Sequence, residues 1–124
     1  MKIKKHKVLK ANISEEFGKY SHDYFSQGSN IDEVKNYLNV ASIAWNLSLY
    51  PEQKRIEEIE NIANDYERLN PEHIKSEHLK RDLEILVEKK LKLFPKIERL
   101  ITKISIEEKG DNYLIHTDSK EFQP

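Results

Sequence analysis

The stretch from Tyr37 to Tyr50 constrains the fold of this chain more than any other part of its sequence. Read as an α-helix with about 100° between residues, its apolar side chains cover about 240° of the helix circumference. Other elements have to cover such a helix on most of its sides, because exposed apolar surface is unfavourable in water. The sequence therefore predicts a fold built around this helix.

One narrow strip of the same helix is polar and, beyond Lys35, carries no charge. It contains Asn39, Ser42 and Asn46. Buried polar side chains need hydrogen-bond partners, so we expect these three to bind either another segment of the chain or a ligand. In the structural alternative, Asn46 holds the backbone of the corner at Pro51 or of a later hairpin.

Three further helices are predicted from end signals and from the spacing of apolar residues. Ser14 and either Ser29 or Asn30 are the expected N-caps of the first two helices, since their side chains can accept bonds from free amides. Gly28 is the expected terminator of the first helix, and Pro51 ends the second. The expected helix ranges are 14–27, 30–49, 51–69 and 72–93 or 94.

After Pro95 the apolar period changes from about 3.6 to 2. Residues 104–107 and 113–116 alternate around turn residues at 108–111, which predicts a β-hairpin. An isolated hairpin is marginal in water, so residues 5–11 are the expected donor of a third strand. The predicted fold class is α+β: about four helices around a central buried helix, then a C-terminal hairpin that can pair with an N-terminal strand.

Length and composition narrow the protein class. With 124 residues, the chain is expected to form a single domain over 1–118, followed by a disordered tail at 119–124. It contains no cysteine, which excludes disulfides, thiolate metal sites and a cysteine nucleophile. The first residues do not resemble a signal peptide, and no stretch reaches the roughly 20 apolar residues of a membrane span. We therefore expect a cytoplasmic protein without membrane partners.

Enzyme and metal chemistry find little support in the sequence. Three glycines and no Gly-x-Ser-x-Gly motif leave no phosphate-binding loop or nucleophile elbow. On the fourth helix, His73 with Glu77 and His78 with Asp82 have a spacing that suits two metal ligands. The two pairs are about 140° apart around the helix, so they cannot form one four-ligand site. We expect no catalytic residues, no metal and no cofactor.

A protein-interaction role is the favoured hypothesis. Ile74, His78 and Ile85 lie nearly opposite the apolar face of the expected fourth helix, where water should be the only neighbour. Either C-terminal structure or a partner should cover this stripe. The sequence thus favours a non-enzymatic interaction or regulatory module that binds an unknown protein or a second copy of itself.

Two alternatives stay open. The first is nucleic-acid binding, because a basic patch would neutralise phosphates at the end of the fourth helix; its residues are Lys89, Lys90, Lys92, Lys96, Arg99 and Lys103. The second is small-molecule binding or catalysis in a pocket lined by Asn39, Ser42, Asn46 and a tyrosine. A salt-sensitive mobility shift would favour the first alternative, and a deep pocket would favour the second.

Two sequence motifs resemble those of a known group of proteins. They are Ala-Trp-Asn-Leu-Ser-Leu-Tyr-Pro-Glu at 44–52 and Lys-Leu-Phe-Pro at 92–95. The chain resembles, over about residues 30–116, small uncharacterised bacterial proteins with a Trp-Asn helix that ends in Pro-Glu and a later Leu-Phe-Pro. The resemblance implies no function, and it directs attention to Trp45, Asn46, Phe94 and Pro95.

Overall fold

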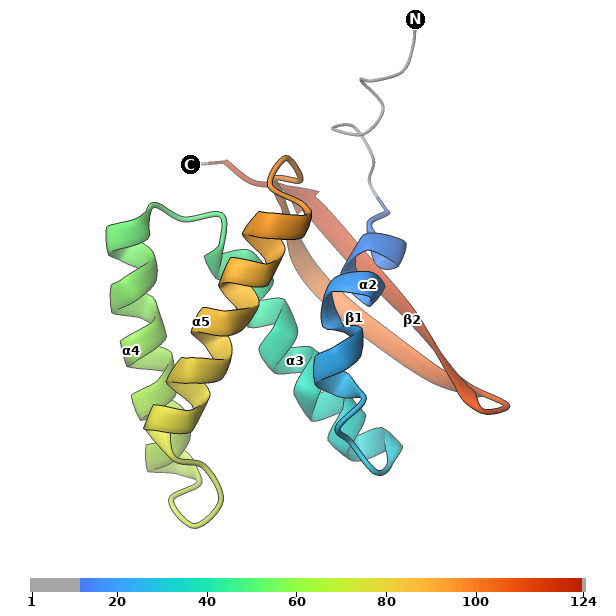
Figure 1. The fold of residues 1–124 in the computed structure, drawn as a ribbon, viewed down its shortest axis with the longest axis horizontal. Coiled ribbons are helices and arrows are strands. Elements are labelled where there is room, and N and C mark those ends of the chain that lie inside the picture. Colours follow the sequence, from blue (N-terminus) through green and yellow to red (C-terminus); the bar gives the residue numbers. More distant parts are fainter. Residues whose placement is uncertain (1–11, 124) are drawn as a thin grey trace, which may run out of the picture.

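Four helices precede a two-stranded antiparallel hairpin in the computed structural model, which describes residues 12–123 (Figure 1). The α+β class and the C-terminal hairpin are therefore as predicted. The expected N-terminal strand at 5–11 falls outside the described residues. The elements are α2 (Ser14–Phe25), α3 (Ile31–Leu47), α4 (Glu52–Leu69), α5 (Ser76–Leu93), β1 (Arg99–Lys109) and β2 (Asn112–Glu121).

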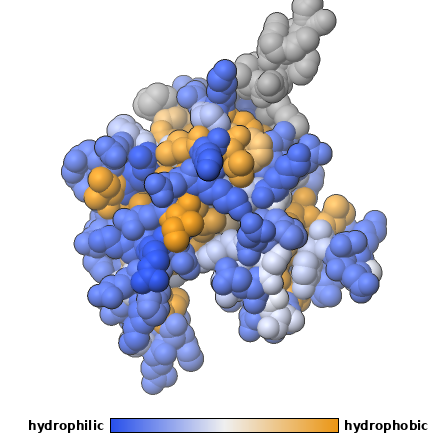
Figure 2. Space-filling view, viewed as in Figure 1, coloured by the Kyte–Doolittle hydropathy of each residue, from blue (hydrophilic) through white to orange (hydrophobic). Residues whose placement is uncertain are grey.

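The hairpin lies against α2 and α3. On the side of the helices away from the hairpin, α4 packs on α5. Two lobes face each other across a notch at the bottom of Figure 2. One lobe holds the end of α4 and the start of α5, and the other holds the corner between α2 and α3. No helix in the described range is long and apolar enough to cross a membrane.

The start of α3 follows the predicted capping pattern. The Asn30 side chain accepts a hydrogen bond from the Glu33 amide at 3.0 Å, and the Glu33 carboxylate accepts one from the Ser29 amide at 2.7 Å. Together they give hydrogen-bond partners to two amides at the start of the helix. The helix ends at Leu47, and Pro51 stands directly before α4.

The predicted cap of α2 is wrong. Ile13 occupies the N-cap position, and the Asn12 side chain accepts a hydrogen bond from the Ser14 amide at 2.9 Å. The Ser14 hydroxyl instead accepts a hydrogen bond from the Thr117 amide of β2 at 2.8 Å. A tertiary contact has thus taken the side chain that the local pattern assigned to the helix end.

Gly28 does not have the positive φ that the expected terminator would need. It follows the end of α2, and a Cβ at this position would lie 2.9 Å from the Val34 side chain and from its amide nitrogen. The position needs glycine because the corner between α2 and α3 is tight.

The start of α5 also differs from the prediction, because the helix begins at Ser76 and not at Glu72. The Glu67 carboxylate, near the end of α4, accepts a hydrogen bond from the Ser76 amide at 2.5 Å. This contact lowers the pKa of Glu67 and supplies a partner for one free amide of α5. Ile74 therefore lies in the loop before α5, and not on the helix face where we expected it.

The hairpin is longer than the sequence predicted. Its loop consists of Gly110 and Asp111, and Gly110 has a φ of 61°, which suits a tight turn between strands. A bulge at Thr102 interrupts the register. A tail without regular structure was expected from Ser119 onward; β2 instead continues to Glu121, and the Phe122 amide donates to the Glu98 carbonyl oxygen at 3.0 Å.

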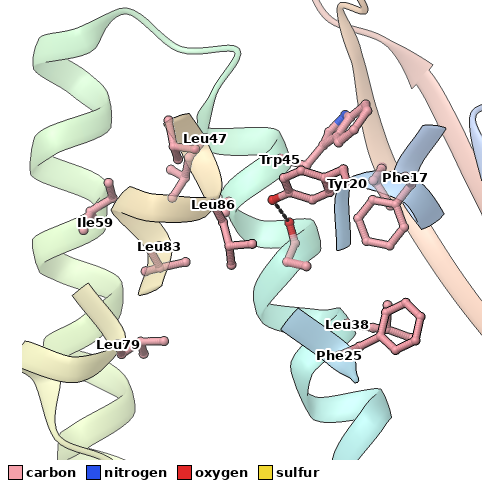
Figure 3. Packing of buried hydrophobic residues seen from close by; sticks show 14 of the residues in the cluster. Phe17, Tyr20, Phe25, Leu38, Trp45, Leu47, Ile59, Leu79, Leu83 and Leu86 are labelled. Atoms are coloured by element: carbon pink, nitrogen blue, oxygen red, sulfur yellow. Dashed lines mark hydrogen bonds between the residues drawn. The ribbon is translucent and has the colours of Figure 1, made fainter. Parts of the chain in front are cut away.

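An aromatic cluster forms the centre of the core (Figure 3). Phe17, Tyr20 and Trp45 are fully buried, and their ring centroids lie 5.2–5.9 Å apart. The Tyr20 hydroxyl donates to the Ala41 carbonyl oxygen at 2.8 Å, so its burial leaves no unpaired polar atom. Leucines from α3 and α5 and Ile59 of α4 extend this core toward α4 and the start of α5.

Candidate functional site

A groove with a volume of about 750 Å³ lies in the notch between the two lobes, which is visible at the bottom of Figure 2. The end of α2, the first half of α3, the end of α4, the following loop and the start of α5 form its walls. Its aromatic and apolar lining comes from Tyr24, Tyr37, Val40, Tyr66, Ile74 and Leu79. Its polar lining comes from Glu33, Asn36, Asn39, Asn70, His73, Lys75, His78 and Asp82.

Tyr24, Tyr37 and Asp82 form one contact cluster in the groove. The Tyr24 hydroxyl donates to Asp82 Oδ2 at 3.0 Å, and the Tyr24 and Tyr37 rings meet edge to face with centroids 4.9 Å apart. Burial raises the pKa of Tyr24 well above its ordinary value of 10, and the neighbouring Asp82 carboxylate raises it further. The Tyr24 hydroxyl therefore keeps its proton, and its role as donor to Asp82, through neutral and mildly alkaline pH.

The structure brings together three of the predicted binding residues and separates a fourth. Asn39, Ile74 and His78 line the groove. Ile85 is 54% exposed and borders a neighbouring hollow of about 350 Å³. Tyr24 and Asp82 line both the groove and the hollow. These two side chains therefore separate Ile74 and His78, in the groove, from Ile85, in the hollow.

The polar strip of α3 is not one site. Asn46 binds Ile101 of β1 twice: its Nδ2 donates to the carbonyl oxygen at 3.0 Å, and its Oδ1 accepts from the amide at 2.8 Å. The Ser42 hydroxyl donates to the Asn39 carbonyl oxygen of its own helix. Of the three, only Asn39 lines the groove, so the structure forms no common pocket for them, and the structural alternative describes Asn46.

The basic cluster at the end of α5 is smaller than the sequence suggested. Lys90 is 1% exposed; its Nζ donates to the Ile97 carbonyl oxygen at 2.6 Å and lies 5.1 Å from the Trp45 ring centroid. Arg99 donates to the hydroxyl and the carbonyl oxygen of Ser119. Lys89 pairs with Asp23 at 3.5 Å. Three members remain exposed and have no such contact with residues 12–123: Lys92, Lys96 and Lys103.

The buried amine of Lys90 gives a testable pH dependence. Burial lowers the pKa of Lys90 from 10.5 to about 8, and Glu98 acts weakly in the opposite direction. Between these two values the unfolded chain binds more protons than the folded chain, so the free energy of unfolding should rise with pH. We expect a rise of roughly 1–2 kcal/mol between pH 7.5 and 9.5, measured by urea denaturation. Tyr20 and Tyr24, whose pKa values are raised from 10, act in the opposite direction at higher pH.

Two variants separate this effect from other titrations. Lys90→Met should remove the rise, whereas Lys89→Met, at the neighbouring and more exposed position, should keep it. A rise of the same size in Lys90→Met would show that another group causes it.

The groove has histidines and carboxylates, but no metal cluster follows from them. Within residues 12–123, no group of three or more histidine or acidic side chains is close enough to hold a metal ion. Asp82, one member of the predicted His78 pair, binds the Tyr24 hydroxyl.

Sequence reasoning missed Tyr24, Tyr37 and Asp82 as groove residues. Tyr24 belongs to an aromatic stripe with helical spacing, which core packing alone would explain. Its contact with Asp82 joins residues 58 positions apart, and no local pattern contains that information.

Comparisons with known proteins add no family to this description. No protein-family model matches the chain, and neither the curated proteins nor the solved structures give a match. The resemblance carried by the Trp-Asn and Leu-Phe-Pro phrases therefore gains no support from them. The function has to be inferred from the site itself.

Proposed function

We propose that this protein is a non-enzymatic interaction module that binds a segment of a partner protein in the groove. The observation that carries the proposal is the composition of the groove. Three tyrosines, three asparagines and two histidines line one surface groove of about 750 Å³, together with Ile74 and two further apolar residues. Tyrosine is enriched in protein-binding surfaces, because it offers a large rigid contact area and a polar end.

The neighbouring hollow favours an extended segment over a small compact ligand. The groove and the hollow share Tyr24 and Asp82, and the hollow continues along α2 and α5 to Ile85 and Leu86. A segment that lies across this shared boundary would contact both parts of the stripe predicted from the sequence. Such a path gives Ile74 and Ile85 a common role although they do not share a helix face.

A peptide selection tests this proposal. Phage-displayed peptides selected on the full chain should contain a common motif, and they should bind the Ile74→Ser variant roughly ten times more weakly or worse, because an apolar contact in the groove is lost. Ile56→Ser is the matched control, since Ile56 is 54% exposed on α4 and lies outside the groove. The proposal would be wrong if no motif emerged, or if the selected peptides bound both variants equally well.

A further inference from the structure

We infer that the segment bound in the groove presents a lysine or arginine side chain to Asp82, Tyr24 and Tyr37. This inference rests on the proposed function and names the chemistry of the partner. It starts from Asp82, a half-buried carboxylate in the wall that the groove shares with the neighbouring hollow.

Asp82 has no cation of the described part of the chain within salt-bridge distance. Among residues 12–123, the acidic side chains with a cationic nitrogen within 4 Å are Asp23, Asp65 and Glu60, and Asp82 is not one of them. Removing a carboxylate from water costs free energy unless hydrogen bonds or an opposite charge replace the lost hydration. Tyr24 supplies one hydrogen bond, to Oδ2. A cation from a partner would supply the opposite charge that residues 12–123 do not.

The aromatic lining supports the same kind of ligand. Tyr24 lies next to this carboxylate and Tyr37 lies next to Tyr24, and tyrosine rings attract ammonium and guanidinium groups through their negative faces. The molecule already uses such contacts elsewhere: Lys90 lies over Trp45, and Lys54 lies 5.7 Å from the Tyr50 ring centroid. The cluster of two tyrosines and Asp82 combines a ring contact with an acceptor for the same cation.

The charges of the groove disfavour an anionic partner. Glu33 and Asp82 contribute two carboxylates, whereas Lys75 is the one lysine or arginine in the lining. The Glu33 carboxylate also accepts the bond from the Ser29 amide, which holds it at the start of α3. Charge complementarity therefore favours a basic residue in the bound segment.

Two matched peptides test the inference on the full chain. They are acetyl-Leu-Arg-Leu-amide and acetyl-Leu-citrulline-Leu-amide, which have nearly the same shape and differ in charge. In an NMR titration we expect both to shift groove amides such as those of Tyr37 and His78. The arginine peptide should bind roughly five to thirty times more tightly.

Asp82→Asn should bring the arginine peptide to the affinity of the citrulline peptide and leave the citrulline peptide nearly unchanged. Glu84→Gln is the control, because Glu84 is an exposed carboxylate of α5 that does not line the groove. Equal binding of both peptides to the wild-type chain would overturn the inference and leave the proposed peptide groove standing. Failure of both peptides to shift groove amides would also overturn it.

A further variant tests whether the chain supplies the cation itself. Residues 1–10 contain five lysines and no acidic residue. If glutamine at all five lysine positions shifted the groove amides and tightened binding of the arginine peptide, the chain's own first residues would be the occupant. The inferred partner segment would then be wrong.

Discussion

Replacing Trp45 with alanine is expected to lower the free energy of unfolding by about 3–5 kcal/mol. Trp45 has no exposed surface, and its ring contacts Phe17, Tyr20 and Phe94. Its Nε1 donates to the Arg99 carbonyl oxygen at 2.9 Å, so the same side chain also fixes the start of β1. Alanine would leave a cavity in the aromatic cluster and an unpaired carbonyl at the base of the hairpin.

Urea denaturation followed by far-UV circular dichroism measures this loss, since Trp45 is the single tryptophan and its fluorescence disappears in the variant. Trp45→Phe keeps an aromatic ring but loses the hydrogen bond, so its loss should be smaller, roughly 1–3 kcal/mol. Leu69→Ala is the control, because Leu69 is 70% exposed and its removal should cost about 0.5 kcal/mol or less. A loss below about 1 kcal/mol for Trp45→Ala would contradict its place in the core.

Replacing Asn46 with leucine is expected to cost about 2–4 kcal/mol, the second large effect. Leucine has the same branching at Cγ but offers neither the donor nor the acceptor that bind the backbone of Ile101. The amide and the carbonyl oxygen of Ile101 would both lose their partners, in a residue that is only 7% exposed. The cost therefore comes from unpaired backbone groups and not from lost packing.

Hydrogen exchange identifies this mechanism directly. In Asn46→Leu the Ile101 amide should exchange with solvent much faster than in the wild-type chain, and urea denaturation should give the loss in stability. Asn36→Leu serves as the control, because Asn36 is exposed on the same helix and its side chain makes no hydrogen bond to residues 12–123. An Ile101 amide that kept its wild-type exchange rate in Asn46→Leu would disprove the proposed role of Asn46.

Local signals in the sequence were enough for the element order. Asn30 caps α3 and Pro51 precedes α4, because capping and proline stereochemistry act within a few residues. The hairpin was visible from its alternating pattern, although its strands were longer than that pattern. Pairing continues toward residues 99 and 121 because α3 and the chain near Glu98 hold the base of the hairpin.

Contacts between distant residues produced the differences. Ser14 binds a strand amide 103 residues away and does not cap α2, and Glu67 takes the first amide of α5, which begins later than its local pattern indicated. Lys90 looked like one of several surface lysines, yet Trp45 and the Ile97 carbonyl oxygen provide partners for a buried amine. The candidate site depends on such contacts as well, and for that reason Tyr24 and Asp82 were not recognised as neighbours.

The attachment of the hairpin also bears on how copies of this protein behave beside one another. A strand at the rim of a sheet can recruit a strand of another copy through its unpaired backbone groups, which is a common route to aggregation. The Asn46 side chain binds the amide and the carbonyl oxygen of Ile101 on β1. The Ser14 hydroxyl binds the amide of Thr117 on β2. On each rim, helix side chains thus occupy backbone groups that a further strand would need. The same bonds that fasten the hairpin to the helices hinder its growth into an intermolecular sheet.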